Sequence, residues 1–224
     1  MHDDIHYQPP TLTVDLVTFQ LIEDQLEVLL LRRAAEPFLG EWALPGGYNN
    51  KGETTHDALA RVAQEKVGLN ISTELGFLEQ LYTFDTVARD PRGHAVSVVY
   101  LGCGSDIHCV GGNSEYRFVP VAALPSLAFD HQEIIHYAHQ RLKNKISYSN
   151  AIQGLLPSEF TLSQLQLAYQ AVLGREIDKR NFRKKILSLG LIKETGNHWR
   201  EGAHRPAKLY AFQHPTLEEF AAPF

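Results

Sequence analysis

Apolar and polar positions alternate along residues 11–22, TLTVDLVTFQLI, where many of the residues are β-branched. This alternation is typical of a β-strand that buries one face. The polar residues Glu23, Asp24 and Gln25 follow, and the apolar stretch LEVLLLRR comes directly after them. The pattern therefore predicts a β-hairpin near the N-terminus.

A different period begins at Thr54, where apolar residues recur at positions 58, 59, 62, 63 and 67. This spacing of three and four residues predicts an amphipathic helix, and Gly68 lies where a glycine commonly ends one. Residues 37–53 are rich in Gly and Pro and predict a long ordered loop before this helix. Further along, the pattern predicts a mixed α and β order, with strands near residues 76–87, 95–103 and 115–121 and a helix near 130–146 that begins at the N-cap Asp130.

The periodic pattern is lost around residues 147–160, which end in LLPSEF, and only short elements follow. Such a loss of period is typical of a junction between modules. We therefore predict two domains, one over residues 1–147 and one over residues 148–224.

The second domain has clear helix signals. Thr161 or Ser163 can cap a helix that ends at Gly174, and Asp178 can cap a basic helix that ends at Gly190. Two strand-like segments, LIKETGNHWR and PAKLYAF, come next. Helix, short turn, basic helix and β-hairpin is the order of a winged helix-turn-helix.

Charge divides the chain in the same way as the periodicity. Residues 1–130 hold 8 Lys and Arg against 18 Asp and Glu, whereas residues 161–210 hold 10 against 4. An acidic first part and a basic second part indicate modules with different partners, the basic one being suited to a polyanion. The alternative is a bipolar surface that only keeps the protein soluble.

Composition excludes several other classes of protein. The 224 residues are 44% hydrophobic and 21% charged, values that exclude disordered, collagen-like and coiled-coil chains. The longest apolar run, residues 28–31, is too short to span a membrane, and acidic residues replace the basic start of a signal peptide. We therefore expect a cytoplasmic protein without a membrane partner. Cys103 and Cys109 lack zinc-site spacing and are expected to be reduced thiols.

The segment GGYNNKGETTHDALARVAQEKVGL, residues 46–69, resembles the Nudix box of nucleoside-diphosphate hydrolases, written GX5EX7REUXEEXGU with U apolar. The resemblance implies an α/β Nudix fold, an α/β/α sandwich around a mixed sheet. Two positions, Val62 and Lys66, depart from the pattern because the family has glutamates there. The matching positions are Gly47, Glu53, Arg61, Ala63, Glu65, Gly68 and Leu69.

The two departures change the chemistry of the predicted helix. Positions 62, 65 and 66 project from one helical face, where three carboxylates would bind Mg²⁺ around a diphosphate. Here that face offers one carboxylate, Glu65, beside the ammonium of Lys66. We therefore predict no catalytic residues and no metal site, with hydrolysis lost and diphosphate binding retained through charge-assisted hydrogen bonds. The alternative is a relic box that only stabilises the helix and its loop.

Basic, glycine and aromatic residues near this segment are the candidates for a nucleotide site. An exposed aromatic side chain on the strand that holds Tyr82 and Phe84 can stack on a base, although core packing explains the pair equally well. Arg89 and Arg92, in the polar loop RDPRGH, are placed to contact a phosphate or only to solvate the turn. The predicted ligand-binding residues are Arg33, Gly46, Gly47, Glu65, Lys66, Tyr82, Phe84 and Arg89.

The basic helix of the second domain has the features of a DNA recognition helix. Its apolar positions line one face and leave basic residues near the exposed N-terminal turns, which a recognition helix places in the major groove. Arginine reads guanine, asparagine reads adenine and lysine pairs with phosphates. The alternative is a solvated basic helix. The predicted DNA-binding residues are Lys179, Arg180, Asn181, Arg183 and Lys184 on the helix and Arg200, His204 and Arg205 on the wing.

The two domains together resemble the Nudix-related transcriptional regulators of NAD metabolism, which join a degenerate Nudix domain to a winged helix. The run from FTLSQLQLAYQAVLGREIDKRNFRKKILSLGLI to GAHRPAKLYAF is similar to their C-terminal signature. The resemblance implies a homodimer that represses NAD synthesis or salvage genes from a palindromic operator in double-stranded DNA. It also implies ADP-ribose or a related nucleotide as effector, with no required cofactor.

Two other functions compete with this interpretation. One is an active Mg-dependent ADP-ribose pyrophosphatase that uses Glu53, Glu65 and Glu79 and carries the basic domain for dimerisation. Val62 and Lys66 argue against it. The other is a DNA-binding protein whose Nudix domain is a scaffold for dimerisation and binds no ligand.

Overall fold

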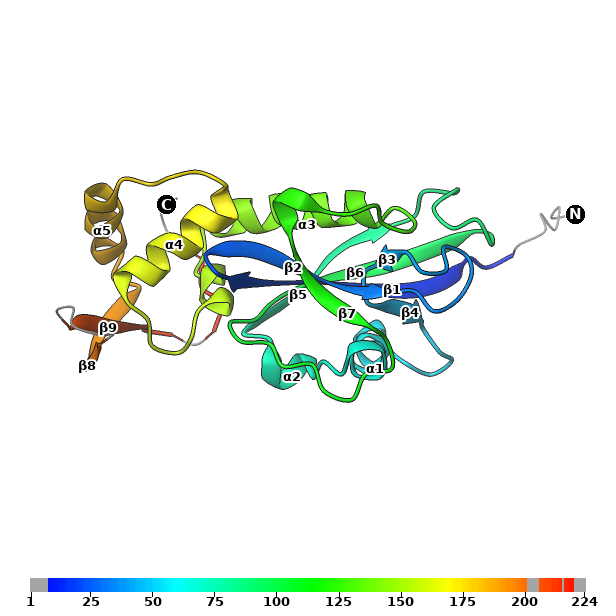
Figure 1. The fold of residues 1–224 in the computed structure, drawn as a ribbon, viewed down its shortest axis with the longest axis horizontal. Helices are drawn as coiled ribbons and strands as arrows, with labels where there is room; N and C mark the ends of the chain where they lie inside the picture. The colour runs from blue at the N-terminus through cyan, green and yellow to red at the C-terminus, as the bar shows by residue number, and fades with distance from the viewer. Residues whose placement is uncertain (1–7, 201–205, 215, 220–224) are drawn as a thin grey trace, which may run out of the picture.

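The computed structural model describes residues 8–200, 206–214 and 216–219. A central sheet has α1 and α2 on one face and α3 on the other, and a smaller helical domain lies beyond one end of the sheet (Figure 1). No helix in the described ranges has the length and apolar character needed to cross a membrane. The elements of the sheet domain are β1 (Thr11–Ile22), β2 (Gln25–Arg32), β3 (Trp42–Ala43), β4 (Gly46–Tyr48), α1 (Thr55–Val67), α2 (Ile71–Glu74), β5 (Phe77–Phe84), β6 (Ala95–Cys103), β7 (Tyr116–Pro120), the 3₁₀ turn η1 (Val121–Ala123) and α3 (His131–Lys145).

The sheet is mixed, as predicted. Its main path runs β3-β2-β1-β6-β5, while β4 pairs with β1 and β7 pairs with β2. The long β1 strand is parallel to β6 and antiparallel to β2 and β4. The predicted hairpin is β1–β2, with Ile22 opposite Gln25, so only Glu23 and Asp24 form the turn. Both turn residues have positive φ angles, 48° and 64°, a geometry that fits the right-handed twist of a two-residue hairpin.

Helix α1 begins and ends where the sequence predicts. The Thr54 hydroxyl accepts a hydrogen bond from the Asp57 N–H, and the Asp57 carboxylate accepts one from the Thr54 N–H. This capping box satisfies amide groups at the start of the helix that have no helical partner. At the other end Gly68 has φ 72°, the left-handed conformation that glycine adopts without a steric penalty.

The C-terminal domain is a winged helix. Thr161 caps α4 with a second capping box, and Asp178 caps α5 by accepting a hydrogen bond of 2.8 Å from the Asn181 N–H. Phe160 adds a single bridge to the hairpin through two backbone hydrogen bonds with Tyr210. The elements are the 3₁₀ turn η2 (Ala151–Leu155), α4 (Leu162–Leu173), α5 (Lys179–Ser188), β8 (Ile192–Trp199) and β9 (Ala207–Phe212).

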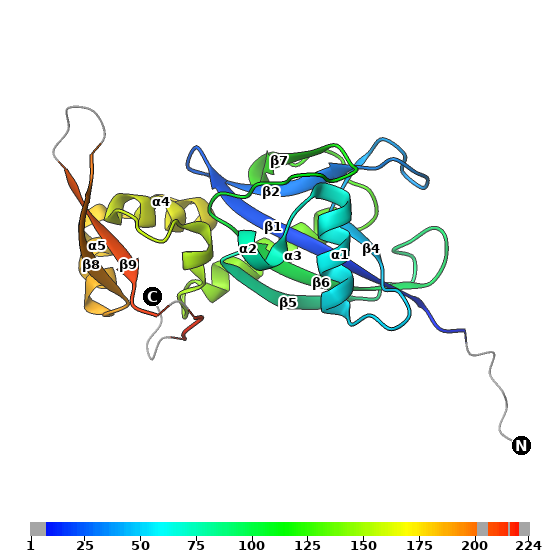
Figure 2. The ribbon, with the colours of Figure 1, turned by 90° about the horizontal axis from the view of Figure 1, so that it is seen from below.

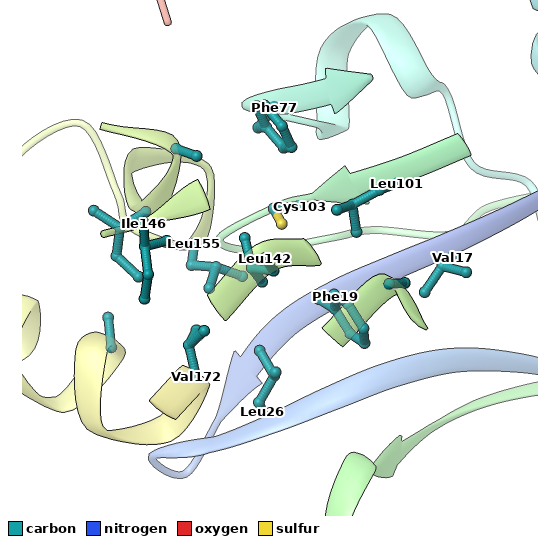
Figure 3. Packing of buried hydrophobic residues seen from close by; sticks show 14 of the residues in the cluster. Val17, Phe19, Leu26, Phe77, Leu101, Cys103, Leu142, Ile146, Leu155 and Val172 are labelled. Atoms are coloured by element: carbon teal, nitrogen blue, oxygen red, sulfur yellow. The ribbon is translucent and has the colours of Figure 1, made fainter. Parts of the chain in front are cut away.

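One hydrophobic cluster joins the two domains. It contains Val17 and Phe19 of β1, Leu142 of α3 and Val172 of α4, all fully buried. Figure 3 shows these side chains packed together with residues from β5, β6 and η2. A second cluster lies on the opposite face of the sheet, against α1. The winged helix is therefore packed onto the sheet domain and continues its core.

The junction between the domains is a buried element. Gly154 of η2 packs so closely that an added Cβ would lie 2.7 Å from the Cβ of Phe77 and 3.0 Å from that of Cys103. The Asn150 amide donates to the Thr216 carbonyl (3.0 Å) and accepts from the Glu218 N–H (2.7 Å). The segment 216–219, after the wing, thus returns to the junction. The exact boundary after residue 147 stays a prediction.

Gly154→Ala tests this close packing. The new methyl group must displace Phe77 or Cys103, so we expect a loss of about 1–3 kcal/mol in the free energy of unfolding. Urea denaturation followed by circular dichroism measures it. A variant as stable as the unchanged protein would contradict the close approach of η2 to β5 and β6.

Candidate functional site

A cavity of about 570 Å³ opens beside the start of the sheet, between α1 and the segments that precede β3 and α3. It contains six of the eight predicted ligand-binding residues. These are Arg33, Gly46, Gly47, Glu65, Lys66 and Arg89. Segments far apart in the sequence thus meet in one place.

Glycine is required at both positions of the β4 segment that lines the cavity. A Cβ at Gly46 would overlap the carboxylate of Asp15, which points to the same place from β1. A Cβ at Gly47 would lie 2.9 Å from a methyl group of Val62. The two glycines therefore allow the backbone to approach β1 and α1 closely.

The α1 face of the cavity holds few free carboxylates. Val62 is buried against Gly47, Lys66 is half-buried and Glu65 is exposed. Glu53 accepts two hydrogen bonds from the Arg61 guanidinium, at 2.6 and 2.8 Å, and these bonds lower the pKa of its carboxyl to about 2. The Glu53 carboxyl is therefore ionised at neutral pH, and its charge is already paired with Arg61.

Two guanidinium groups gather at one aromatic ring on the opposite wall. The Cζ atoms of Arg33 and Arg92 lie 4.7 and 5.8 Å from the centre of the Phe129 ring. Arg92 also donates to the Tyr48 hydroxyl (2.9 Å) and pairs with Asp90. Burial, followed by the charge of Arg92, lowers the pKa of Arg33. This wall combines positive charge with flat aromatic surface.

Arg33 differs from Arg92 in its partners. Its guanidinium donates to the backbone carbonyls of Pro37 (2.8 Å) and Ala35 (3.3 Å). Within the described part of the chain no carboxylate forms an ion pair with it, so its charge is available to an anion.

Charged side chains that are almost fully buried form the floor of the cavity. Arg89 donates two hydrogen bonds to Asp130, at 2.9 and 2.8 Å, and lies 3.6 Å from Asp15. Asp15 in turn accepts a bond of 2.5 Å from the Ser97 hydroxyl. His131 accepts a bond of 2.9 Å at Nδ1 from the Leu44 N–H, and burial lowers its pKa. Its ring is therefore neutral, with the proton on Nε2.

The contacts of these buried residues correct one prediction about α3, the helix that begins beside them. Asp130 occupies the N-cap position of α3, but its side chain makes no capping hydrogen bond. Its carboxylate is used by Arg89, which precedes it by 41 residues in the chain. Arg89 thus supports the wall of the cavity as well as lining it.

Tyr82 and Phe84 do not lie in the cavity. Their rings pack against Tyr137 of α3, with ring centres 5.3 and 5.7 Å away from it. Phe84 belongs to the hydrophobic core and Tyr82 is half exposed on the α3 side of the sheet. These two aromatic residues therefore lie apart from the six predicted ligand-binding residues that line the cavity. Of the two explanations left open by the sequence, core packing describes Phe84.

The acid proposed for a hydrolytic alternative lies elsewhere too. Glu79 of β5 accepts a hydrogen bond of 2.6 Å from Lys145 at the end of α3, and it does not line the cavity. The structure therefore does not bring Glu79 together with Glu53 and Glu65.

Sequence reasoning missed most of the other residues that line the cavity, four of which bear on its chemistry, and it named Arg92 without assigning it. Asp15 is the one charged residue of strand 11–22 and lies at a buried position, a signal that was available. Tyr48 sits inside the Nudix-box segment. Nothing in the local pattern marked the other two. The four residues are Asp15, Tyr48, Phe129 and His131.

The second candidate surface is the exposed side of α5 with the neighbouring hairpin. Lys179, Arg180, Asn181 and Lys184 are exposed, as predicted. Arg183 is half-buried and donates to the Ser163 hydroxyl of α4 (3.3 Å), so part of its side chain packs between the helices. Figure 2 shows the β8–β9 hairpin extending beside α5.

The hairpin places only part of the predicted wing. Arg200 is exposed at its end, next to Trp199, whose side chain is also exposed. His204 and Arg205 lie outside the described residues.

Comparison with known proteins identifies both domains. Residues 12–138 match the model of the NUDIX domain, and residues 152–212 match that of the NrtR DNA-binding winged helix domain. The chain is 33% identical over 212 residues to the ADPR responsive transcriptional repressor NtrR of Acinetobacter baylyi, with 92% of this chain and 83% of that protein covered.

Solved structures agree with this match. Shewanella oneidensis NrtR complexed with a 27mer DNA is 33% identical and has a TM-score of 0.80, with 95% of this chain and 99% of that chain covered. The NUDIX domain of Shewanella oneidensis NrtR complexed with ADP ribose is 34% identical, with a TM-score of 0.54 over 63% of this chain and 94% of that chain.

The buried His131 ring gives a test of the cavity floor. Its pKa is lower in the folded protein than in the unfolded chain, so the unfolded chain binds more protons as the pH falls. We expect this residue to reduce the free energy of unfolding below about pH 6.5, by at most about 1.4 kcal/mol per pH unit. His131→Gln keeps an acceptor for the Leu44 N–H and should flatten this decline in urea titrations.

His136→Gln is the matched control, because His136 is exposed on the same helix. It should keep the pH dependence of the unchanged protein. Equal slopes for His131→Gln and the unchanged protein would contradict a neutral His131 in the fold.

Proposed function

Because the chain belongs to the NrtR family, in which a NUDIX domain precedes an NrtR DNA-binding winged helix domain, we propose that it is a transcriptional repressor controlled by ADP-ribose. Its relatives supply both parts of the proposal, since one is named as an ADPR responsive repressor and others are complexed with DNA and with ADP ribose. Its target genes are those of NAD synthesis or salvage.

The observation that carries the effector half is the half-buried Arg33 guanidinium, which faces a second guanidinium and pairs with no described carboxylate. A diphosphate supplies the missing negative charge and accepts charge-assisted hydrogen bonds from Arg33 and Arg92. Tyr48 and Phe129, which line the same cavity, offer aromatic surface to the base in place of Tyr82 and Phe84. Gly46, Gly47, Glu65, Lys66 and Arg89 complete the proposed site.

The protein binds this nucleotide without hydrolysing it. Magnesium-assisted hydrolysis needs several carboxylate oxygens around the diphosphate, and α1 presents Val62 and Lys66 where two of them belong. Glu53 is held by Arg61, and Glu79 is held by Lys145 outside the cavity. The pyrophosphatase alternative therefore lacks a set of neighbouring acids.

The exposed surface of α5 binds DNA in this proposal. The exposed N-terminal turns of α5 enter the major groove, where Arg180 and Asn181 contact base edges and Lys179 and Lys184 contact phosphates. Arg183 contributes less than predicted because its side chain is partly committed to α4. The wing, with Arg200, contacts the backbone beside the groove. The protein acts as a homodimer, whose two recognition helices match a palindromic operator about one helical turn apart.

Phosphorus NMR of ADP-ribose with stoichiometric protein and Mg²⁺ tests the effector half. We expect diphosphate signals that are shifted or broadened and persist for several hours. Arg33→Gln should reduce the shift, because it removes the unpaired charge. Growth of AMP and ribose phosphate signals would instead establish a hydrolase.

Loss of charge on α5 tests the DNA half. Arg180→Ala and Lys184→Ala should each weaken operator binding, by about 1–3 kcal/mol where a base contact is lost and by less for a phosphate contact. Fluorescence anisotropy with an operator selected from random-sequence DNA measures this, and ADP-ribose affinity should stay unchanged.

Lys51→Ala, at an exposed position before α1, removes the same charge from the other domain and should leave DNA affinity intact. Equal effects of Lys51→Ala and Lys184→Ala would contradict direct contact between α5 and DNA, because they would show that only the net positive charge of the protein matters.

A further inference from the structure

Three consecutive residues, 129–131, lie where the wall of the cavity meets the start of α3. Phe129 and His131 line the cavity, and Asp130 between them binds Arg89, which lines it as well. Phe129 also has a φ of 56°, a left-handed conformation that costs energy for a residue with a side chain. The beginning of α3 is therefore fixed by side chains of the cavity.

The Asp130 carboxylate stands between two alternative sets of partners. It lies at the N-cap position of α3, where an aspartate normally accepts hydrogen bonds from the N–H groups of the first turn. Asp178 does this for α5 in the same chain, with ψ 120°, whereas Asp130 has ψ 16°, so capping by Asp130 requires the backbone at the start of α3 to rearrange. Instead, both carboxylate oxygens of Asp130 accept hydrogen bonds from Arg89. The Asp130 side chain is only 14% exposed and the Arg89 side chain only 5%.

The other half of α3 holds the DNA-binding domain. His139 donates from Nε2 to the Val172 carbonyl near the end of α4, at 2.8 Å. Ala138 and Leu142 of α3 share one hydrophobic cluster with Leu165 and Ala168 of α4. A well-packed helix of 15 residues thus connects the cavity wall to the first helix of the winged domain.

We propose that Asp130 is the positioning residue through which the effector acts on the winged helix, an inference that rests on the proposed function. A diphosphate oxygen that binds Arg89 competes with the Asp130 carboxylate for the guanidinium. The released carboxylate caps α3, so neither buried charge is left without a partner. The first turn of α3 changes, and the packed helix carries the change to α4.

The test compares coupling between the two ligands. Coupling is the factor by which ADP-ribose changes the Kd for the selected operator DNA, and typical allosteric factors are about 5 to 150. Asp130→Asn keeps the size of the side chain but removes its negative charge. The side chain then no longer pairs with Arg89 in one state and caps α3 as a carboxylate in the other. We expect its coupling factor to fall to within about twofold of one, while ADP-ribose and DNA each still bind.

Glu133→Gln is the matched control, an acid-to-amide change at an exposed position in the first turn of the same helix. It should keep the coupling of the unchanged protein. A folded Asp130→Asn variant with undiminished coupling would overturn the proposal. Absence of ADP-ribose binding or of coupling in the unchanged protein would instead overturn the proposed function.

Hydrogen exchange in the unchanged protein tests the capping role of Asp130 even if a variant fails to fold. Capping by Asp130 slows exchange of the amides of Gln132 and Glu133, so ADP-ribose should increase their protection. Protection that stays equal or falls in the bound protein would contradict a capping role for Asp130.

Discussion

The continuous hydrophobic core between the domains is the constraint on which the rest of the molecule depends. Phe19 of β1, Leu142 of α3 and Tyr169 of α4 belong to one buried cluster, so the winged helix has no solvated linker on which to pivot. Burial of each large apolar side chain contributes on the order of 1.5–3 kcal/mol, and separation of the domains would expose many of them together. The winged helix can therefore change its position only if the packed helices rearrange.

The charged lining of the cavity bears on whether the proposed site binds or cleaves a diphosphate. Six basic and four acidic side chains line it, and carboxylates already pair with four of the bases, namely Arg32, Arg61, Arg89 and Arg92. Among the described residues, Arg33 and Lys66 form no ion pair, and in the proposed function their charge takes the place of a metal beside the phosphates. Guanidinium groups bind phosphate without activating water, so the proposed site binds a diphosphate without the means to cleave it.

Most elements were predictable because their signals are local. The capping box of α1, the left-handed Gly68 and the two-residue hairpin turn each depend on a few neighbouring residues. The cavity was predictable only in part, because its walls come from distant segments. Asp130 shows the reason: its position in the sequence predicts a helix cap, and only the tertiary fold brings Arg89 to its carboxylate. Tyr82 and Phe84 lie outside the cavity for a related reason, since alternation along a strand does not tell which face of the sheet borders a cavity.

The return of segment 216–219 to Asn150 has a consequence for synthesis of the chain. Asn150 makes hydrogen bonds with Thr216 and Glu218 through both its amide side chain and its backbone N–H. The ribosome makes the junction long before it makes these partners, so the sheet domain folds first and the buried junction is completed only afterwards. A polypeptide released before residue 216 therefore keeps the hydrophobic core that joins the domains but lacks these hydrogen bonds at the junction.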